Sequence, residues 1–257
     1  MKKTRLVPFL FALSCAHTAP STEAPAAAAV PTAAYAAIVD APDRLDADRA
    51  IDGGRHPAKM LEFLGVKPGM KVADLGAAGG YTTELLARAV GPTGVVYGQN
   101  SPFILERFAE KPWSERLARP AMKGVVRVDR DFEAPLPPEA TGLDLVVMNA
   151  VYHDTVWLKV DRDKMNRAVF DALKPGGAYV VIDSSAKAGT GLADVQTLHR
   201  IDEQAVRDEV ARAGFTLAGD SDFLRNPQDT RDWSSSPGAA KERRGTGDRF
   251  ALKFVKP

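Results

Sequence analysis

The sequence predicts an α/β fold, a doubly wound and mostly parallel sheet with helices on both faces. Short apolar segments alternate with helical segments from about residue 58 to the end of the chain. The glycine-rich stretch Gly76–Gly80 joins the first strand to a helix, as in units of strand, turn, helix and strand. Hydrophobic residues make up 45% of the 257 residues and charged residues 26%. This composition allows a sizeable core and excludes a wholly disordered or collagen-like chain.

The elements follow one another in a regular order. Ala58–Gly65 has apolar residues at helical spacing, and the turn Lys67–Gly69 leads into an apolar strand at Lys71–Leu75. Further helices are predicted at Tyr81–Val90, Phe103–Ala109, Asp163–Leu173 and Glu203–Ala213. Further strands are predicted at Val95–Gln99, Val125–Val128, Leu143–Met148, Tyr179–Ile182 and Phe250–Val255. In such a sheet, ligands bind at the carboxyl ends of the strands, beside the point where the strand order reverses.

Residues 1–15 are typical of an export signal. Basic residues precede the apolar run Leu6–Leu13, which is too short for a transmembrane helix of about 20 residues. Ala12–Cys15 resembles a bacterial lipobox, which makes this segment a lipoprotein leader and Cys15 a candidate lipid anchor to a membrane. The alternative is a signal peptide cleaved within Ala24–Ala29. Both predict export to the bacterial cell envelope, in the periplasm; a cytoplasmic location follows if this segment is not an export signal.

The rest of the chain is predicted to be a tether followed by one folded domain. Residues 16–42 are rich in Ala and Pro, so they bury too little apolar surface to offset the ordering entropy and should be disordered. Residues 43–257 form the predicted domain. The 34 basic and 33 acidic residues give a net charge of +1, and no strong field directs the protein to nucleic acid. The single cysteine, Cys15, excludes an intramolecular disulfide framework and a Cys-based zinc site.

Three motifs stand in a recognisable order. Asp74–Gly80 places an acid at the end of a strand and glycines in the following turn, Asp131–Phe132 precedes a Leu-Pro pair, and Leu143–Val147 is an apolar strand. In these motifs the sequence resembles the class I S-adenosylmethionine-dependent methyltransferases, over roughly Ala58 to Lys256. The resemblance implies a seven-stranded Rossmann-like sheet with an antiparallel last strand, and S-adenosyl-L-methionine as the cofactor.

The glycine turn is the first part of the implied cofactor site. Glycines let a ligand approach the backbone closely, and the N-terminus of the following helix presents unpaired N–H groups. The resemblance implies that Asp74 faces the methionine amino group, that Gly76 lets the adenosyl part pass, and that Gly80 is a further cofactor-binding residue. Ala78 stands where the family usually has a glycine.

The remaining implied cofactor contacts follow later strands. Gln99 and Asn100 end the second strand, where most family members have an acid that binds the ribose hydroxyls. Their neutral amides are weaker acceptors than a carboxylate. Asp131 would accept a hydrogen bond from the adenine amino group, beside the backbone N–H of Phe132, and Asn149 ends the fourth strand of the set.

Tyr152, His153 and Asp154 occupy the position that faces the transferred methyl group in this family. His153 titrates near neutral pH and would remove a proton from the nucleophile as general base. Asp154 would orient its imidazole, and Tyr152 would line the pocket or stack on a cation. Methyl transfer from a sulfonium is a direct displacement, so alignment supplies much of the rate and a base is optional. The alternative is that His153 caps a helix or orders the loop.

Further motifs narrow the resemblance. They are Val66–Met70, Tyr152–Asp154, Leu173–Gly177, His199–Asp202, Phe223–Pro227 and Asp248–Phe254. They resemble a group of predicted bacterial methyltransferases that often carry signal peptides. The group implies no acceptor, so we expect methyl transfer to an unidentified small molecule and leave the oligomeric state open. His199, Arg200 and Arg225 lie where substrate lids commonly sit, although salt bridges explain them equally well.

Several alternatives remain open. A nicotinamide-dependent enzyme would need Gly-x-Gly-x-x-Gly, which this turn lacks. A metal-assisted O-methyltransferase could hold Mg²⁺ with Asp154, Asp183 and Asn149, whereas our main interpretation assigns no metal. A noncatalytic envelope ligand-binding protein with the same fold is the third alternative, because S-adenosylmethionine is made in the cytosol. The polar segment Arg225–Arg249 is expected to be a mobile surface loop or to fold over the acceptor.

Overall fold

The computed structural model describes Met1 and residues 32–257. Within them, seven strands form one sheet in the order β3-β2-β1-β4-β5-β7-β6, parallel except where β7 pairs with β5 and β6. The strands are β1 (Lys71–Leu75), β2 (Val95–Asn100), β3 (Val125–Asp129), β4 (Leu143–Asn149), β5 (Leu173–Ser184), β6 (Thr216–Ser221) and β7 (Arg249–Val255). The strand order reverses between β1 and β4, so the predicted doubly wound sheet with an antiparallel last strand is confirmed.

Helices cover both faces of the sheet. One face packs on α1, α3 and α4 through residues such as Val72 and Leu145, and the other packs on α6, α8 and α10 through residues such as Val146 and Tyr179. The helices are α1 (Thr32–Val39), α2 (Asp46–Arg55), α3 (Pro57–Leu64), α4 (Tyr81–Val90), α5 (Pro102–Ile104), α6 (Glu110–Leu117), α7 (Tyr152–Trp157), α8 (Arg162–Ala172), α9 (Val195–Leu198), α10 (Glu203–Arg212) and α11 (Pro237–Ala240). A π-helical turn, Leu105–Ala109, joins α5 to α6.

The start of the domain differs from the prediction. Residues 32–42 were expected in the disordered tether, but α1 packs against α3 and buries Tyr35, whose hydroxyl donates a hydrogen bond to the carbonyl of Val66 at 2.8 Å. The buried side chain of Tyr35 gives this Ala-rich helix an apolar contact with the domain, which its alanines alone would not supply. The predicted leader with Cys15, and the tether up to residue 31, lie outside the described residues apart from Met1. Among the described residues, no helix is long and apolar enough to cross a membrane.

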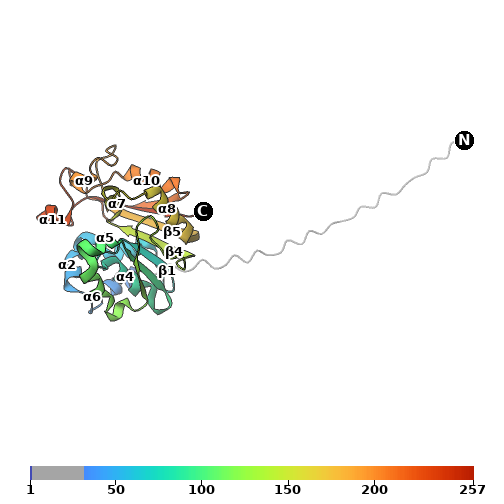
Figure 1. The fold of residues 1–257 in the computed structure, drawn as a ribbon, viewed down its shortest axis with the longest axis horizontal. Coiled ribbons are helices and arrows are strands. Elements are labelled where there is room, and N and C mark those ends of the chain that lie inside the picture. Colours follow the sequence, from blue (N-terminus) through green and yellow to red (C-terminus); the bar gives the residue numbers. More distant parts are fainter. Residues whose placement is uncertain (2–31) are drawn as a thin grey trace.

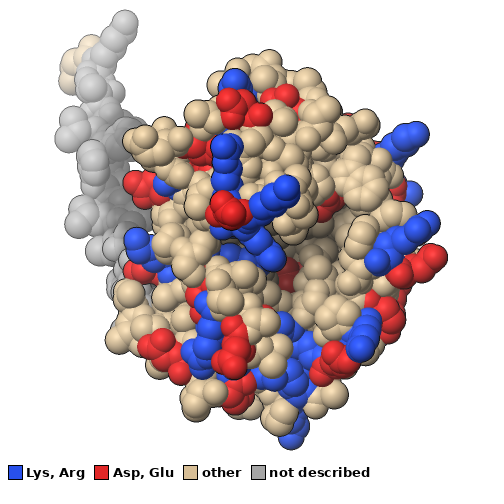
Figure 2. Space-filling model, turned by 90° about the vertical axis from the view of Figure 1, so that its left-hand side faces the viewer, with Lys and Arg blue, Asp and Glu red and all other residues tan. Residues whose placement is uncertain are grey.

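The carboxyl ends of the parallel strands form one side of the molecule. Helices α5, α7 and α9 follow β2, β4 and β5, and they lie with α2 and α11 on the left in Figure 1. Figure 2 looks onto this side and shows a central hollow, with basic side chains around it and acidic atoms in its depth. This is the edge at which a doubly wound sheet binds its ligand.

Candidate functional site

Asp74 lies at the centre of the carboxyl edge, near the end of β1. It is buried, and its carboxylate accepts a 2.6 Å hydrogen bond from the Thr83 hydroxyl in the first turn of α4. Burial raises the pKa of Asp74 to about 7, against the opposing effects of Thr83 and of the nearby charge of Arg55. A buried carboxyl group with so few partners among the described residues can take a cationic ligand.

The glycine turn is shaped by the protein's own packing more than the sequence suggests. Gly76 and Gly80 both have positive φ, 70° and 83°. A Cβ on Gly76 would lie 2.6 Å from the Val151 side chain, and one on Gly80 would lie 2.6 Å from the ring of Trp113. The expectation that Gly76 makes room for the adenosyl part is therefore wrong on its Cβ side, where Val151 already lies. The same side of Gly80 is filled by Trp113. The outer side of the turn, at the exposed Ala78, stays open to a ligand.

Gln99 and Asn100 also differ from their expected role. Both are fully buried, and their amides bind backbone groups instead of facing a crevice. The Gln99 side chain accepts a hydrogen bond from the Gly76 N–H and donates one to the carbonyl of Arg130. The Asn100 side chain accepts from the Ala78 N–H at 2.7 Å and donates to the Ala78 carbonyl at 3.1 Å. The two residues at the family's ribose-binding position therefore hold the glycine turn in this protein.

The contacts of Asn100 explain why an amide replaces the family's acid. Ala78 has φ of 48°, a left-handed conformation that is strained for a residue with a side chain. An amide can accept from its N–H and donate to its carbonyl at the same time, whereas a carboxylate can only accept. Asn100→Asp should therefore lower the free energy of unfolding by about 1–3 kcal/mol, because a carboxylate would face the carbonyl unsatisfied. Urea unfolding measures this, with the exposed Asp131→Asn as the control; a more stable Asn100→Asp variant would contradict it.

The other implied cofactor residues lie along the same edge. Asp131, two residues beyond β3, is exposed, whereas the Phe132 side chain is buried in the core. The Asn149 amide nitrogen, at the end of β4, donates to the Thr82 hydroxyl at 3.1 Å. An adenine contact at Asp131 stays a prediction.

Two arginines stand beside this site without an acidic partner. Arg55 ends α2, with its guanidinium 4.6 Å from the centre of the Tyr81 ring, and Arg249 begins β7. Burial and the charge of Arg55 lower the pKa of Arg249 to about 10. Burial lowers the pKa of Arg55 as well. Among the described residues, no carboxylate oxygen lies within 4.0 Å of either guanidinium, so an anionic ligand would relieve their repulsion.

These charges test the fit of the implied cofactor. The methionine end of S-adenosylmethionine carries an ammonium and a carboxylate. The edge offers a buried acid, Asp74, together with the guanidiniums of Arg55 and Arg249; that of Arg249 donates to the Gly54 carbonyl, but neither has a carboxylate partner among the described residues. The donor set therefore fits the methionine end. The ribose end has lost its usual side-chain partners, because Gln99 and Asn100 hold the turn.

His153 lies in a cluster of titratable groups after β4. Its Nδ1 is 2.6 Å from Asp183 Oδ1, and its backbone N–H donates to Asp183 Oδ2 at 2.8 Å. Its Nε2 lies 3.2 Å from Asp154, and the His199 ring packs edge-on with its centre 4.4 Å away. Although burial opposes the imidazolium, the charge of Asp183 and the contact with Asp154 raise the pKa of His153 to about 10. A charged imidazolium has no lone pair to accept a proton, which argues against the expected general base.

The two sequence neighbours of His153 differ in location: Tyr152 lies in the core and Asp154 lies at the carboxyl edge. Tyr152 is fully buried, donating to Glu209 at 2.9 Å and accepting from Asn166 at 2.9 Å. The expectation that it lines the pocket or stacks on a cation is therefore wrong. Asp154 stays at the edge and accepts a 2.8 Å hydrogen bond from the Trp157 indole.

The magnesium alternative does not match the geometry. It needs free oxygen ligands from Asp154, Asp183 and Asn149. Asp183 is fully buried, and its oxygens already accept from the His153 backbone and the Ser184 N–H and contact the His153 ring. Asp183 therefore positions His153 and offers no ligand to an ion at the edge.

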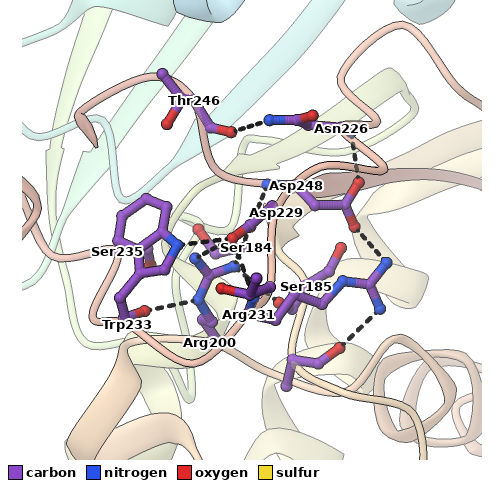
Figure 3. A network of polar contacts seen from close by, with 12 residues as sticks. Ser184, Ser185, Arg200, Asn226, Asp229, Arg231, Trp233, Ser235, Thr246 and Asp248 are labelled. Atoms are coloured by element: carbon purple, nitrogen blue, oxygen red, sulfur yellow. Dashed lines mark hydrogen bonds and ion pairs between the residues drawn. The ribbon is translucent and has the colours of Figure 1, made fainter.

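The segment between β6 and β7 is ordered by a buried ion pair. The Arg200 guanidinium, fully buried, contacts Asp229 at 2.8 Å and lies 4.6 Å from the centre of the Trp233 ring. Asp229 also accepts from the Asp248 N–H at 2.6 Å, which joins the segment to the start of β7 (Figure 3). Salt bridging is thus the role of Arg200, and the expectation of a mobile loop at residues 225–249 is wrong.

Arg249 is the site residue that sequence analysis missed. Its only signal was its place at the start of the last strand, in Asp248–Phe254, and nothing in the sequence brings it near Arg55. The spatial link comes from the antiparallel return of β7 beside β5, which brings Arg249 level with Ser184 at the carboxyl edge.

Comparison with known proteins places this geometry among methyltransferases. The family model of protein-L-isoaspartate(D-aspartate) O-methyltransferase matches residues 25–126. The chain is 32% identical over 124 residues to protein-L-isoaspartate O-methyltransferase of Aeropyrum pernix, covering 48% of this chain and 42% of the relative. Ribosomal RNA large subunit methyltransferase E of Rhodopseudomonas palustris is 30% identical over 212 residues, covering 72% of this chain and 82% of the relative.

The isoaspartate relatives share only part of their length with this chain. The match covers 42% of the Aeropyrum protein and 58% of the corresponding protein of Pyrococcus horikoshii, so the chain spans about half the length of these curated relatives. Among solved structures, an S-adenosylmethionine-dependent methyltransferase of Aquifex aeolicus aligns with a TM-score of 0.58 at 17% identity, covering 87% of this chain and 98% of that one. This likeness confirms the predicted fold.

Proposed function

The chain belongs to the class I S-adenosylmethionine-dependent methyltransferases, and on this basis we propose that it transfers the S-methyl group to a carboxylate oxygen of its acceptor. The observation that carries the proposal is the pair of guanidiniums without a carboxylate partner among the described residues, Arg55 and Arg249, at the edge that also holds the buried Asp74. A cofactor and an acceptor that each carry a carboxylate would give both cations a partner.

The cofactor half of the proposal follows from charge. S-Adenosylmethionine supplies an electrophilic methyl group on a sulfonium. Asp74 would hold the ammonium of its methionine end, and Arg55, close enough to influence Asp74, would hold the carboxylate. The outer side of the turn at Ala78 and the exposed Asp131 leave the adenosine side open to solvent.

The choice of a carboxylate as methyl acceptor rests on the positive charge of Arg249 and on the names of the relatives. A carboxylate is already ionised at neutral pH, so no base is needed: the new C–O bond forms as the C–S bond breaks, and the electron pair stays on sulfur. The isoaspartate family model and the archaeal relatives are named for esterification of a protein carboxyl group. We therefore put an isoaspartyl protein or peptide ahead of the small molecule expected from sequence.

The test is transfer of isotopically labelled methyl groups from S-adenosylmethionine. The full chain is given a peptide with one isoaspartyl residue, the same peptide with ordinary aspartate, and small dicarboxylic acids. We expect base-labile label on the isoaspartyl peptide, and Arg249→Met should lower kcat/KM about tenfold or more by removing a charge-assisted contact.

The control is Arg212→Met, since Arg212 of α10 forms an exposed ion pair with Asp163 of α8, and neither residue belongs to the proposed site. Ribosomal RNA is tested in the same assay as a further acceptor, and label on it alone would overturn the carboxylate acceptor but leave methyl transfer standing. Tight cofactor binding with no transfer to any acceptor would instead favour the noncatalytic ligand-binding protein.

A further inference from the structure

We infer that His153, Asp154 and His199 form a binding site for a divalent first-row transition metal of the Zn²⁺ type. One candidate ligand atom from each residue lies within 4.8 Å of the other two. The three residues come from α7 and from the residue that ends α9, two elements in contact at the carboxyl edge. The inference rests on this cluster and does not depend on the proposed acceptor.

The distances suit a tetrahedral ion. Asp154 Oδ1 lies 3.2 Å from His153 Nε2 and 3.5 Å from His199 Nε2. Two ligands each about 2.05 Å from a tetrahedral zinc ion lie about 3.3 Å apart. Small side-chain movements would therefore bring all three atoms onto one ion.

The second observation is the unsatisfied nitrogen of His153. Its side chain is only 4% exposed, yet among the described residues no partner meets the geometry of a hydrogen bond to its Nε2. Leaving such a buried atom unpaired is unfavourable. A metal ion that displaces the Nε2 proton to solvent would satisfy this nitrogen, whereas Asp154 lies near it in a poor direction for a hydrogen bond.

Asp183 completes the arrangement found around metal-bound histidines. It contacts His153 Nδ1 at 2.6 Å and holds the backbone N–H of the same residue. A carboxylate on the far ring nitrogen fixes the orientation of the imidazole and directs Nε2 to the ion. Asp183 is thus a positioning residue for the metal ligand His153.

The second histidine is held in place by the ordered segment before β7. His199 has φ of 55°, and its carbonyl accepts a 2.5 Å hydrogen bond from the Ser235 hydroxyl. Its side chain is 29% exposed and that of Asp154 is 21% exposed. The cluster is therefore closed at His153 and open to solvent at the other two ligands, which leaves a coordination position for water or an oxygen ligand.

The ligand set selects the class of ion. Imidazole nitrogen suits zinc, copper, iron and nickel, while Mg²⁺ and Ca²⁺ prefer oxygen ligands alone. Two histidines and one carboxylate with an open position are typical of catalytic zinc and of non-haem iron sites. Zn²⁺ is the direct probe, and Co²⁺ reports coordination through its visible absorption.

The test compares metal binding by the full chain and its variants. Calorimetry with Zn²⁺ should show a site that is lost, or weakened at least about 100-fold, in His199→Asn. Asparagine tolerates the left-handed backbone of residue 199, so the variant should fold. Asp183→Asn should weaken the site about 10- to 100-fold, because Asp183 orients the ring of the metal ligand His153.

His56 provides a matched control. It is exposed and also left-handed, with φ of 45°, and it lies outside the cluster. His56→Asn should bind Zn²⁺ like the unchanged protein, and Co²⁺ absorption of a low-coordinate site should appear in both and disappear in His199→Asn. Equal Zn²⁺ affinity and stoichiometry in His199→Asn and the unchanged protein would overturn the inference.

Discussion

Asp74→Asn is expected to weaken binding of S-adenosylmethionine by about 10- to 150-fold. The substitution keeps the shape of the side chain and an oxygen that accepts from Thr83, but removes the negative charge that would hold the methionine ammonium. A hydrogen bond to a charged group contributes about 1.5–3 kcal/mol, which gives this range of affinity. Calorimetry of the full chain measures the dissociation constant directly.

The pH dependence gives this prediction a second readout. Because the pKa of Asp74 is raised to about 7, its carboxylate becomes protonated below that pH. Affinity for S-adenosylmethionine should therefore fall as the pH drops from 8 to 5.5, and the variant should show a flatter profile. The control ligand is 5′-methylthioadenosine, which lacks the methionine end and should bind the protein and the variant within about threefold of each other.

Stability separates lost binding from lost folding. The folded protein binds the Asp74 proton more tightly than the unfolded chain, whose pKa is near 3.8. The contribution of this group to the free energy of unfolding is full below pH 4 and falls as the pH rises to about 7. Asp74→Asn should thus be at least as stable as the unchanged protein at pH 8. Unchanged cofactor affinity in a folded variant would remove Asp74 from the site.

The sequence predicted the parts of the fold where apolar periodicity is strong. The segments Lys71–Leu75 and Tyr81–Val90 have the predicted bounds, because a buried strand and an amphipathic helix each show a clear period. The edge strand Thr216–Ser221 was missed, since it is polar and largely exposed and shows no alternation. Its position is set by pairing with β7, which no local pattern reveals.

The site was predicted in its location but not in the role of each residue. Motif order placed Asp74 and His153 at the carboxyl edge, because the ends of parallel strands meet there. Motif order could not show that Asn100 holds the backbone of Ala78. This role follows from the alanine at position 78, where the family usually has a glycine. Nor could it show the pairing of His153 with Asp183, which joins side chains 30 positions apart across β4 and β5.

Arg200→Met is expected to lower the free energy of unfolding by about 3–5 kcal/mol. The side chains of Arg200 and Asp229 are both fully buried, and removing one partner leaves an uncompensated charge in the interior. The exposed pair Arg212 and Asp163 offers the control, since Arg212→Met should change stability by less than about 1 kcal/mol. Denaturant unfolding followed by circular dichroism measures both.

A double variant distinguishes an unpaired charge from lost packing. Replacing a buried ion pair by apolar side chains is often neutral, so Arg200→Met combined with Asp229→Leu should recover part of the loss. Recovery would be incomplete, because Asp229 also accepts from the Asp248 N–H and the Trp233 indole. The single variant should also expose the segment before β7 to trypsin, because Arg200 contacts the Trp233 carbonyl there. A loss below about 1 kcal/mol with unchanged cleavage would mean that this ion pair does not order the segment.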